Sequence, residues 1–228
     1  MIDFHSHILP CIDDGCKNTN ESLILLSILE NEGVDTVCLT PHFYPNREDI
    51  DTFLSRRNKS YELLKSEYKG SIKLLLGSEV RYYRGISNNE EISKLTLENT
   101  KLLLLELPFN EQVTDLMLQE VINLSKNQHL TVVLAHIERY DISDETIKNL
   151  QNVGILIQAN TESFIGLFKG KKAINRLNKG LIDIIGTDSH DPINRIPRYK
   201  TIKDILDKKL GKEVLETLNL RLKSLINI

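Results

Sequence analysis

Cysteine is scarce in this 228-residue sequence, and the scarcity excludes several kinds of protein. The three cysteines, Cys11, Cys16 and Cys38, are odd in number and form no pair of CxxC motifs. We therefore expect neither a disulfide framework nor a structural zinc site. None of them is followed by arginine at the Cys-x5-Arg spacing of a thiol phosphatase, so chemistry based on that phosphate-binding loop is excluded.

An excess of positive charge and long apolar runs are also missing. The net charge is -3 with neutral histidines, whereas proteins that bind the phosphate backbone of nucleic acids are usually rich in Lys and Arg. No apolar run approaches the length of a membrane span, and Asp3, His5 and His7 interrupt the opening residues, which argues against a signal peptide. We expect a cytoplasmic protein that binds no nucleic acid and inserts no segment into a membrane.

No Gly/Ser-rich or Pro-rich linker and no repeat divides the sequence, so residues 1–228 are predicted to form a single domain. Short apolar runs, most of them nearly continuous, alternate with helical patterns, as is typical of parallel strands covered by helices. The runs lie at 2–6, 35–40, 72–77, 101–107, 131–135, 154–159 and 182–186. Seven of them favour a βα barrel over an open doubly wound sheet, which stays an alternative.

Amphipathic patterns predict helices in the intervals between these runs. The first is expected from a cap at Asn20 to about Glu32, with Gly33 as its stop. The others are expected at 48–69, 114–128, 143–152, 170–179 and 198–226. The stretch from Tyr199 to Ile228 has an apolar face that would pack on the barrel.

In the first run, apolar Ile2 and Phe4 alternate with Asp3 and His5. This period predicts a half-buried strand, at the end of which His5 and His7 share one face. Two imidazoles on one face are typical of a metal site when other segments bring further donors.

Nearly every other predicted strand also ends in a side chain that can bind a metal ion. The candidates are His5, His7, His42, Glu79, Glu106, His136, Asp188 and His190. Each has an ordinary explanation when taken singly, such as a surface acid or a helix cap. Because the carboxyl ends of parallel barrel strands meet at one mouth, we instead expect them to converge there. His129 precedes a strand and is interpreted as a surface residue.

Asp13 and Asp14 follow the first strand, and we expect one of them to bind metal while the other stabilises the turn. Five histidines and four carboxylates are too many donors for one ion. They predict two or three divalent ions that share a bridging carboxylate. Two adjacent ions lower the pKa of a shared water toward about 7 and so make hydroxide available at neutral pH.

Three arginines are candidate phosphate ligands. Arg139 and Arg195 follow His136 and His190 closely, and a guanidinium fork there would bind phosphate oxygens and neutralise charge on the transferring group. We interpret both as catalytic and substrate-binding residues and Arg198 as a weaker substrate-binding candidate, while a solvated loop arginine is the alternative. Arg81 and Arg84 are expected to shape the rim.

The order of the motifs resembles a known superfamily over almost the full chain. The motifs are FHSHILPCIDDG, TPHF, GSEV, LLELP, AHIERY and GTDSHDPINRIPR. They are similar to the polymerase-and-histidinol-phosphatase (PHP) superfamily, and within it to the bacterial CpsB/CapC/YwqE type of metal-dependent protein-tyrosine phosphatase. The opening H-x-H-x-L-P-x-I-D-D-G is the most specific piece. Cys11 departs from it, because this subgroup usually has glycine there.

This resemblance implies a distorted (β/α)7 barrel with a trinuclear site, usually of manganese, with iron, cobalt, magnesium or zinc as alternatives. It implies one ion at His5, His7, Glu79 and Asp188, a second at Glu79, Glu106 and His136, and a third at Asp14, His42 and His190. We expect a metal-bridging hydroxide to attack phosphotyrosine without a covalent phosphoenzyme. The implied substrate is the tyrosine-rich tail of a bacterial tyrosine kinase that controls capsular or extracellular polysaccharide.

Several alternatives compete with this interpretation. A histidinol-phosphate phosphatase or another phosphatase of small molecules belongs to the same superfamily. A module that binds the kinase without catalysis would be expected to have lost ligands. An amidohydrolase barrel would offer a bridging lysine and fewer carboxylates, and a DNA exonuclease would need a basic surface. The sequence makes no prediction of the oligomeric state.

Overall fold

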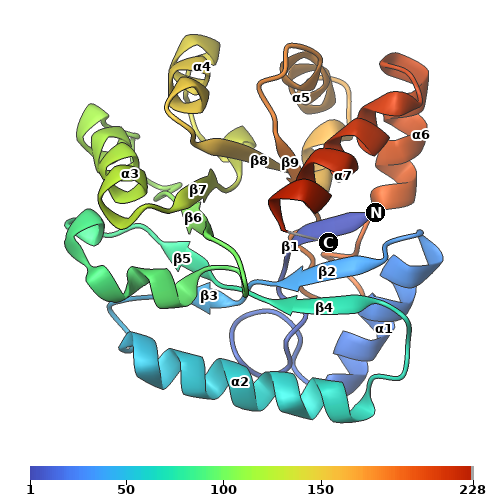
Figure 1. The fold of residues 1–228 in the computed structure, drawn as a ribbon. Coiled ribbons are helices and arrows are strands. Elements are labelled where there is room, and N and C mark those ends of the chain that lie inside the picture. Colours follow the sequence, from blue (N-terminus) through green and yellow to red (C-terminus); the bar gives the residue numbers. More distant parts are fainter. Residues whose placement is uncertain (227–228) are drawn as a thin grey trace.

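The computed structural model describes residues 1–226 and places the strands in a central ring with helices around it (Figure 1). All paired strands are parallel. The strands are β1 (Ile2–Ser6), β2 (Thr36–Leu39), β3 (His42–Phe43), β4 (Lys73–Leu76), β5 (Glu79–Arg81), β6 (Leu102–Glu106), β7 (Thr131–Leu134), β8 (Leu156–Asn160) and β9 (Ile184–Gly186). The predicted run 35–40 thus continues into β3, and the run 72–77 continues into β5.

Two sheets, β1-β2-β4 and β3-β5-β6-β7-β8-β9, are joined into one barrel. At the breaks, the amide of Gly77 donates to the Leu39 carbonyl at 2.9 Å and the amide of Glu79 donates to the Pro41 carbonyl at 3.0 Å. On the opposite side, the Asp188 amide donates to the His5 carbonyl at 2.7 Å, next to a bridge between Ser6 and Ser189. The first and last strands are therefore neighbours, which confirms the predicted barrel and excludes the open sheet.

The first strand is buried on both faces, so the prediction of a half-buried strand was wrong. Its pairing with β2 slips by one residue between Asp3 and Ser6, which is the signature of a bulge. As a result, two successive side chains point inward. Phe4 packs in the apolar interior, and the imidazole of His5 faces the barrel mouth. Tyr199 covers the outer face, where its hydroxyl donates to the Ile2 carbonyl at 3.0 Å.

Apolar side chains fill the amino-terminal half of the barrel and confine polar groups to the other end. This inner layer includes Phe4, Leu104, Val133 and Ile184. Leu222, from a helix near the C-terminus, packs against it. Burying a side chain of this size contributes roughly 1.5–3 kcal/mol. A second layer packs between the strands and the surrounding helices.

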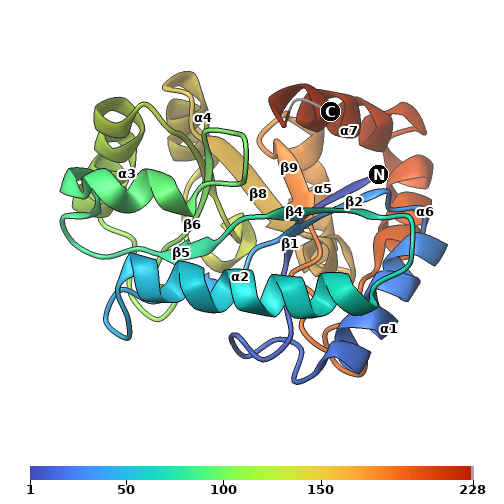
Figure 2. The ribbon, with the colours of Figure 1, turned by 60° about the horizontal axis from the view of Figure 1, so that its bottom comes forward.

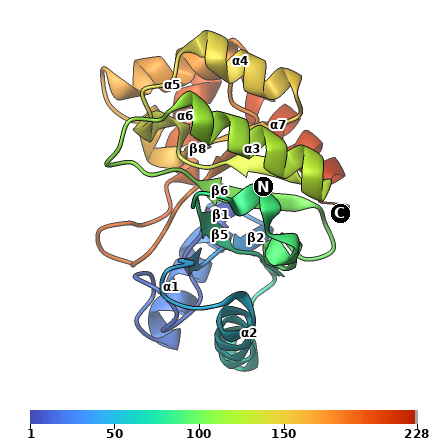
Figure 3. The same ribbon diagram turned by 90° about the vertical axis from the view of Figure 1, so that its left-hand side faces the viewer.

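The helices surround the barrel on its outer side. They are α1 (Thr19–Asn31), α2 (Ile50–Glu67), α3 (Asp115–Gln128), α4 (Asp144–Asn152), α5 (Lys169–Asn178), α6 (Tyr199–Lys209) and α7 (Glu213–Leu225). Short 3-10 turns lie at η1 (Ile86–Asn88), η2 (Glu90–Leu95), η3 (Ile137–Arg139) and η4 (Thr161–Phe164). Figure 2 shows α2 running along β4 and β5, and Figure 3 shows the loop that follows β9 on the side away from α7.

Helix boundaries differ from the sequence-based prediction by one or two residues, and one predicted helix is divided. Asn18, not Asn20, caps α1 by accepting the amide of Glu21 at 3.0 Å. The predicted helix 198–226 is two helices, because Gly211 adopts φ +102° between α6 and α7, a value that only glycine takes readily. Residues 227 and 228, which the predicted C-terminal helix and the predicted domain 1–228 also included, lie outside the described residues.

Within residues 1–226, no helix has both the length and the apolar character that crossing a membrane would need.

Replacing Gly186 by alanine should destabilise the barrel where β9 meets β1. A Cβ there would lie 2.5 Å from the His5 Cβ and 2.9 Å from the His5 amide nitrogen, so backbone must shift. We expect a loss of about 2–3 kcal/mol in the free energy of unfolding. Gly154→Ala is the control, because nothing lies within 4 Å of its Cβ and only its φ of +91° costs energy, about 1 kcal/mol. Urea denaturation with EDTA present measures both, and equal losses would contradict the close contact.

Candidate metal centre

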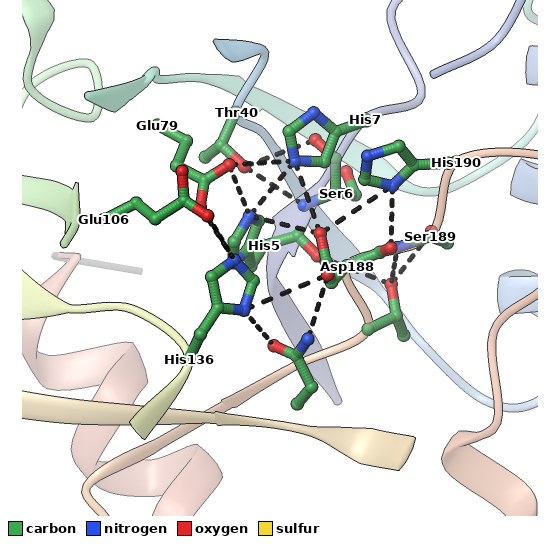
Figure 4. Close-up of polar contacts among 12 residues, drawn as sticks. His5, Ser6, His7, Thr40, Glu79, Glu106, His136, Asp188, Ser189 and His190 are labelled. Carbon is green, nitrogen blue, oxygen red and sulfur yellow. Dashed lines mark hydrogen bonds and ion pairs between the residues drawn. The ribbon is translucent and has the colours of Figure 1, made fainter. Parts of the chain in front are cut away.

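At the carboxyl end of the barrel the structure brings together all nine side chains that the sequence predicts as ligands. Figure 4 labels all of them except Asp14 and His42. They form four overlapping groups, in each of which one donor atom per residue lies within 4.8 Å of the others. The groups are His7, Asp14, His42 and His190; His5, His136 and Asp188; His5, His7 and Glu79; and His42, Glu79 and Glu106. All members except Asp14 and His42 are buried.

Glu79, which has no exposed surface, lies at the centre of the cluster. Its Oε2 lies 2.9 Å from His42 Nδ1, 3.2 Å from His7 Nε2 and 3.3 Å from His5 Nε2, and its Oε1 accepts from His136 Nε2 at 2.8 Å. Burial alone raises the pKa of a carboxyl, but these imidazoles hold the pKa of Glu79 well below its ordinary value. A carboxylate that faces four imidazoles is placed to bridge cations.

The break between β4 and β5 aims Glu79 into the mouth. The buried Arg57 of α2 holds this break, since its Nη1 donates to the Gly77 carbonyl at 3.0 Å and to Ser78 Oγ at 3.2 Å. The pairing of β3 with β5 then sets His42 directly opposite Glu79. Sequence reasoning missed Arg57, because an arginine within an amphipathic helix gives no sign of its buried partners.

His5 and His7 bring their Nε2 atoms to 3.2 Å from each other. The ring of His7 is oriented by Asp13, whose Oδ2 lies 2.7 Å from His7 Nδ1. Burial lowers the pKa of His7, but Asp13 and Glu79 outweigh that effect and hold it well above its ordinary value. Burial lowers the pKa of His5.

Asp13 and Asp14, the two acids that follow the first strand, have different surroundings. Asp13 also accepts the amide of Gly15 at 3.0 Å and that of His42 at 2.9 Å, so it orients ligands and the turn. Asp14 is largely exposed and lies 3.6 Å from both His42 Nε2 and His190 Nε2. Its contact with His190 holds the pKa of Asp14 below its ordinary value despite partial burial.

His136 and Asp188 occupy the left-handed backbone region, with φ of 54° each. Strain of this kind costs about 1–3 kcal/mol and gathers at functional sites, although Asp and His tolerate it better than most residues. The side chain of Asn160 fixes both groups, because its Oδ1 lies 3.0 Å from His136 Nδ1 and its Nδ2 donates to Asp188 Oδ2 at 2.9 Å. Gln158 Oε1 accepts the His136 amide at 3.0 Å. Neither Asn160 nor Gln158 was predicted from the sequence as a supporting residue.

The donor set fits divalent cations. His42 Nδ1, Glu79 Oε2 and His190 Nε2 are buried and make no hydrogen bond of regular geometry, although the first two lie only 2.9 Å apart. Buried polar atoms are rarely left without partners, so these atoms are suited to bind cations. Imidazole nitrogens mixed with carboxylate oxygens suit manganese, iron and zinc.

Two of the three candidate arginines border the cluster. Arg139 Nη2 donates to Asp188 Oδ2 at 2.8 Å, and Arg195 Nη2 donates to the same oxygen at 2.6 Å. These three residues line a small cavity of about 50 Å³. Arg198 instead lies 3.7 Å from Glu162, outside the residues that line this cavity.

The other residues named from the sequence have simpler surroundings. Arg81 donates to Glu106 Oε2 at 2.7 Å, and Arg139 lies 3.3 Å from Glu106 Oε1, so both guanidinium groups hold this carboxylate at the rim. Arg84 is exposed. His129 is exposed at the end of α3, as predicted. Cys11, at the position where the resembling subgroup usually has glycine, adopts φ 59°.

Known proteins match this chain along nearly its whole length. The family described as capsular polysaccharide synthesis, CpsB/CapC, matches residues 1–224. The tyrosine-protein phosphatase CpsB of Streptococcus agalactiae is 29% identical, over 93% of this chain and 92% of that protein. The tyrosine-protein phosphatase YwqE of Bacillus subtilis is 28% identical, over 94% of this chain and 87% of that protein.

A solved structure supports the fold. It is described as YwqE from Bacillus subtilis and CpsB from Streptococcus pneumoniae, unique metal-dependent tyrosine phosphatases, and it superposes with a TM-score of 0.80. The match has 23% identity and covers 100% of this chain and 94% of the other, so it shows the same barrel. Because the family match spans almost the entire sequence, the chain belongs to the CpsB/CapC family of capsular polysaccharide synthesis.

Proposed function

We propose that this chain is a metal-dependent protein-tyrosine phosphatase. The observation that carries the proposal is the cluster of nine imidazole and carboxylate side chains around Glu79, seven of them buried, with Arg139 and Arg195 at its edge. Relatives that share 28–29% of its residues are named tyrosine-protein phosphatases, which supports the same reaction here. A barrel that had become a binding module would have no need to keep every donor.

Two or three divalent cations, most simply Mn²⁺, would be held by the nine donors, with Glu79 shared between ions. The four groups in the structure support this sharing, because Glu79 belongs both to the group with His5 and His7 and to the group with His42 and Glu106. The other two groups, His5, His136 and Asp188, and His7, Asp14, His42 and His190, adjoin these. When bound, such ions polarise phosphoryl oxygens and lower the pKa of water.

Arg139 and Arg195 would bind the phosphate. Both guanidinium groups point at one oxygen of Asp188, so they reach the edge of the cluster from the same side. A phosphate placed beside Asp188 would meet two forks of N–H donors that match its oxygens. The tyrosine leaving group has a pKa near 10, so its departure needs less protonation than an alkoxide would. No side chain has to act as a general acid.

The substrate we propose is phosphotyrosine on the tail of a bacterial tyrosine kinase that controls capsular or extracellular polysaccharide. The family description, which names capsular polysaccharide synthesis, and the names of the relatives support this choice. A kinase tail of that kind would place the chain in the cytoplasm. Arg198, which faces Glu162 but does not itself line the small cavity, would contact the tail rather than the phosphate.

Removing divalent ions should abolish hydrolysis of a phosphotyrosyl peptide, and Mn²⁺ should restore it. We expect a loss of about 100-fold or more, since the donors alone supply no nucleophile. Mn²⁺ at about 100 times its Kd should also raise the Tm of the stripped protein by about 5–10 °C. Full activity after exhaustive EDTA treatment would refute the proposal. Faster turnover of histidinol phosphate than of the peptide would favour a small-molecule phosphatase.

Replacing His136 by alanine should remove a donor and lower the metal content of the purified protein. Because changes even in residues that only support metal ligands cost about 10–100-fold in affinity or activity, we expect at least a 100-fold fall in kcat/KM for p-nitrophenyl phosphate. His129→Ala is the matched control, because His129 is exposed at the end of α3. Elemental analysis and steady-state kinetics measure both effects. A His136→Ala protein with full metal content and activity would contradict the assignment.

Replacing Arg195 or Arg139 by lysine should weaken phosphate recognition while keeping the charge. Lysine cannot make the paired, charge-assisted hydrogen bonds of a guanidinium. Its introduction should raise KM for a phosphotyrosyl peptide about tenfold and weaken inhibition by inorganic phosphate to a similar extent. Arg221→Lys on α7 serves as the control, since Arg221 pairs with Asp183 away from the cluster. Unchanged kcat, KM and phosphate inhibition in both variants would remove the proposed role.

A further inference from the structure

A second cavity, of about 350 Å³, lies beside the metal centre, between the barrel wall and α5. Its walls include the apolar residues Ile137, Ala159, Ala173 and Ile182. Two lysines of α5, Lys169 and Lys172, also line it, and both are exposed. The cavity therefore combines apolar walls with a positively charged border.

This cavity adjoins the small cavity at the edge of the metal centre. Arg139, Asn160 and Glu162 line both of them. The small cavity also contains Asp188 and Arg195, where we place the phosphate. A chain whose phosphate sits there would have its neighbouring residues within reach of Lys169 and Lys172.

The charges of the cavity favour an anionic occupant. Its two acids are engaged, because Glu162 faces Arg198 and both carboxylate oxygens of Glu138 accept the Asn160 amide at 3.3 Å. The cavity's Arg176 is engaged as well, since it donates to Asp144 and to backbone carbonyls.

The two lysines are not engaged in this way. Within the part of the chain that the structure describes, neither Lys169 nor Lys172 lies within 4.0 Å of a carboxylate, so neither ammonium group makes an ion pair. They are free to attract a negative charge from outside the chain.

We infer that this cavity is a substrate subsite that binds an acidic side chain next to the phosphotyrosine. A glutamate has the required form, with an apolar stem to lie along Ala159 and Ala173 and a carboxylate to meet Lys169 and Lys172. This inference rests on the proposed phosphatase function and adds a preference in the sequence of the substrate. The subsite selects phosphotyrosines in acidic surroundings, whereas the metal centre and the arginines recognise the phosphate itself.

Two matched peptides test the subsite. One carries phosphotyrosine with two glutamates on each side, and the other carries glutamines at the same positions, so they differ in charge and hardly in shape. The wild-type protein should hydrolyse the glutamate peptide with a kcat/KM about three- to tenfold higher, in keeping with two partly exposed ion pairs. The difference should shrink as salt is added.

Lys169→Ala/Lys172→Ala should abolish this difference without changing hydrolysis of p-nitrophenyl phosphate, which has no flanking residues. Lys171→Ala is the matched control, because Lys171 is exposed on the same helix but does not line the cavity. It should keep the preference for glutamate.

Equal kcat/KM of the wild-type protein for the two peptides would overturn the subsite, and so would a loss of preference in Lys171→Ala equal to that in the double variant. These outcomes leave the phosphatase function standing as long as both peptides are hydrolysed. Failure of the metal-loaded wild-type protein to hydrolyse either peptide would instead contradict the phosphatase function, and the subsite with it. Hydrolysis of p-nitrophenyl phosphate at the wild-type rate shows that a variant is folded.

Discussion

The fold is organised around one costly arrangement, a fully buried carboxylate that faces four imidazoles. Burying an unpaired charge is prohibitive, so Glu79 is tolerable only because His5, His7, His42 and His136 approach it together. That convergence needs strands from distant parts of the chain at one level of the barrel. It also needs an apolar layer beneath, which keeps water away from the donors on that side.

The donors stand where the strands depart from regular geometry. A bulge lets His5 follow Phe4 into the interior, the interruption between β4 and β5 turns Glu79 inward, and left-handed backbone presents His136 and Asp188. A regular strand shows alternate residues to opposite faces, so it could not place successive side chains on one face. Supporting groups such as Arg57 hold these irregular points in place.

The sequence predicted the barrel, and it predicted the residues that the structure brings together in the cluster, because both follow from one rule: parallel strands end at the same mouth. Features that depend on tertiary contacts were missed. Asn160 and Gln158 are neutral, so no charge or spacing distinguishes them from ordinary strand residues. The buried outer face of β1 depends on Tyr199, which is nearly two hundred positions away. Gly211 could have predicted the break between α6 and α7, since glycine after an amphipathic run is a helix-stop signal.

The closure of the barrel, where the residues that follow β9 bond to β1, has a consequence for the order of folding. The Ile2 amide donates to Asn219 Oδ1 of α7, and the His5 carbonyl accepts from the Asp188 amide. The residues of β1 therefore form these hydrogen bonds with residues that are synthesised much later. Contacts between such distant segments form slowly, because a long loop must close before they stabilise anything. A nascent chain still on the ribosome would contain His5 and His7 before Asp188 and His190 are made. The donor cluster can therefore assemble only after the segment that carries Asp188 and His190 has been made.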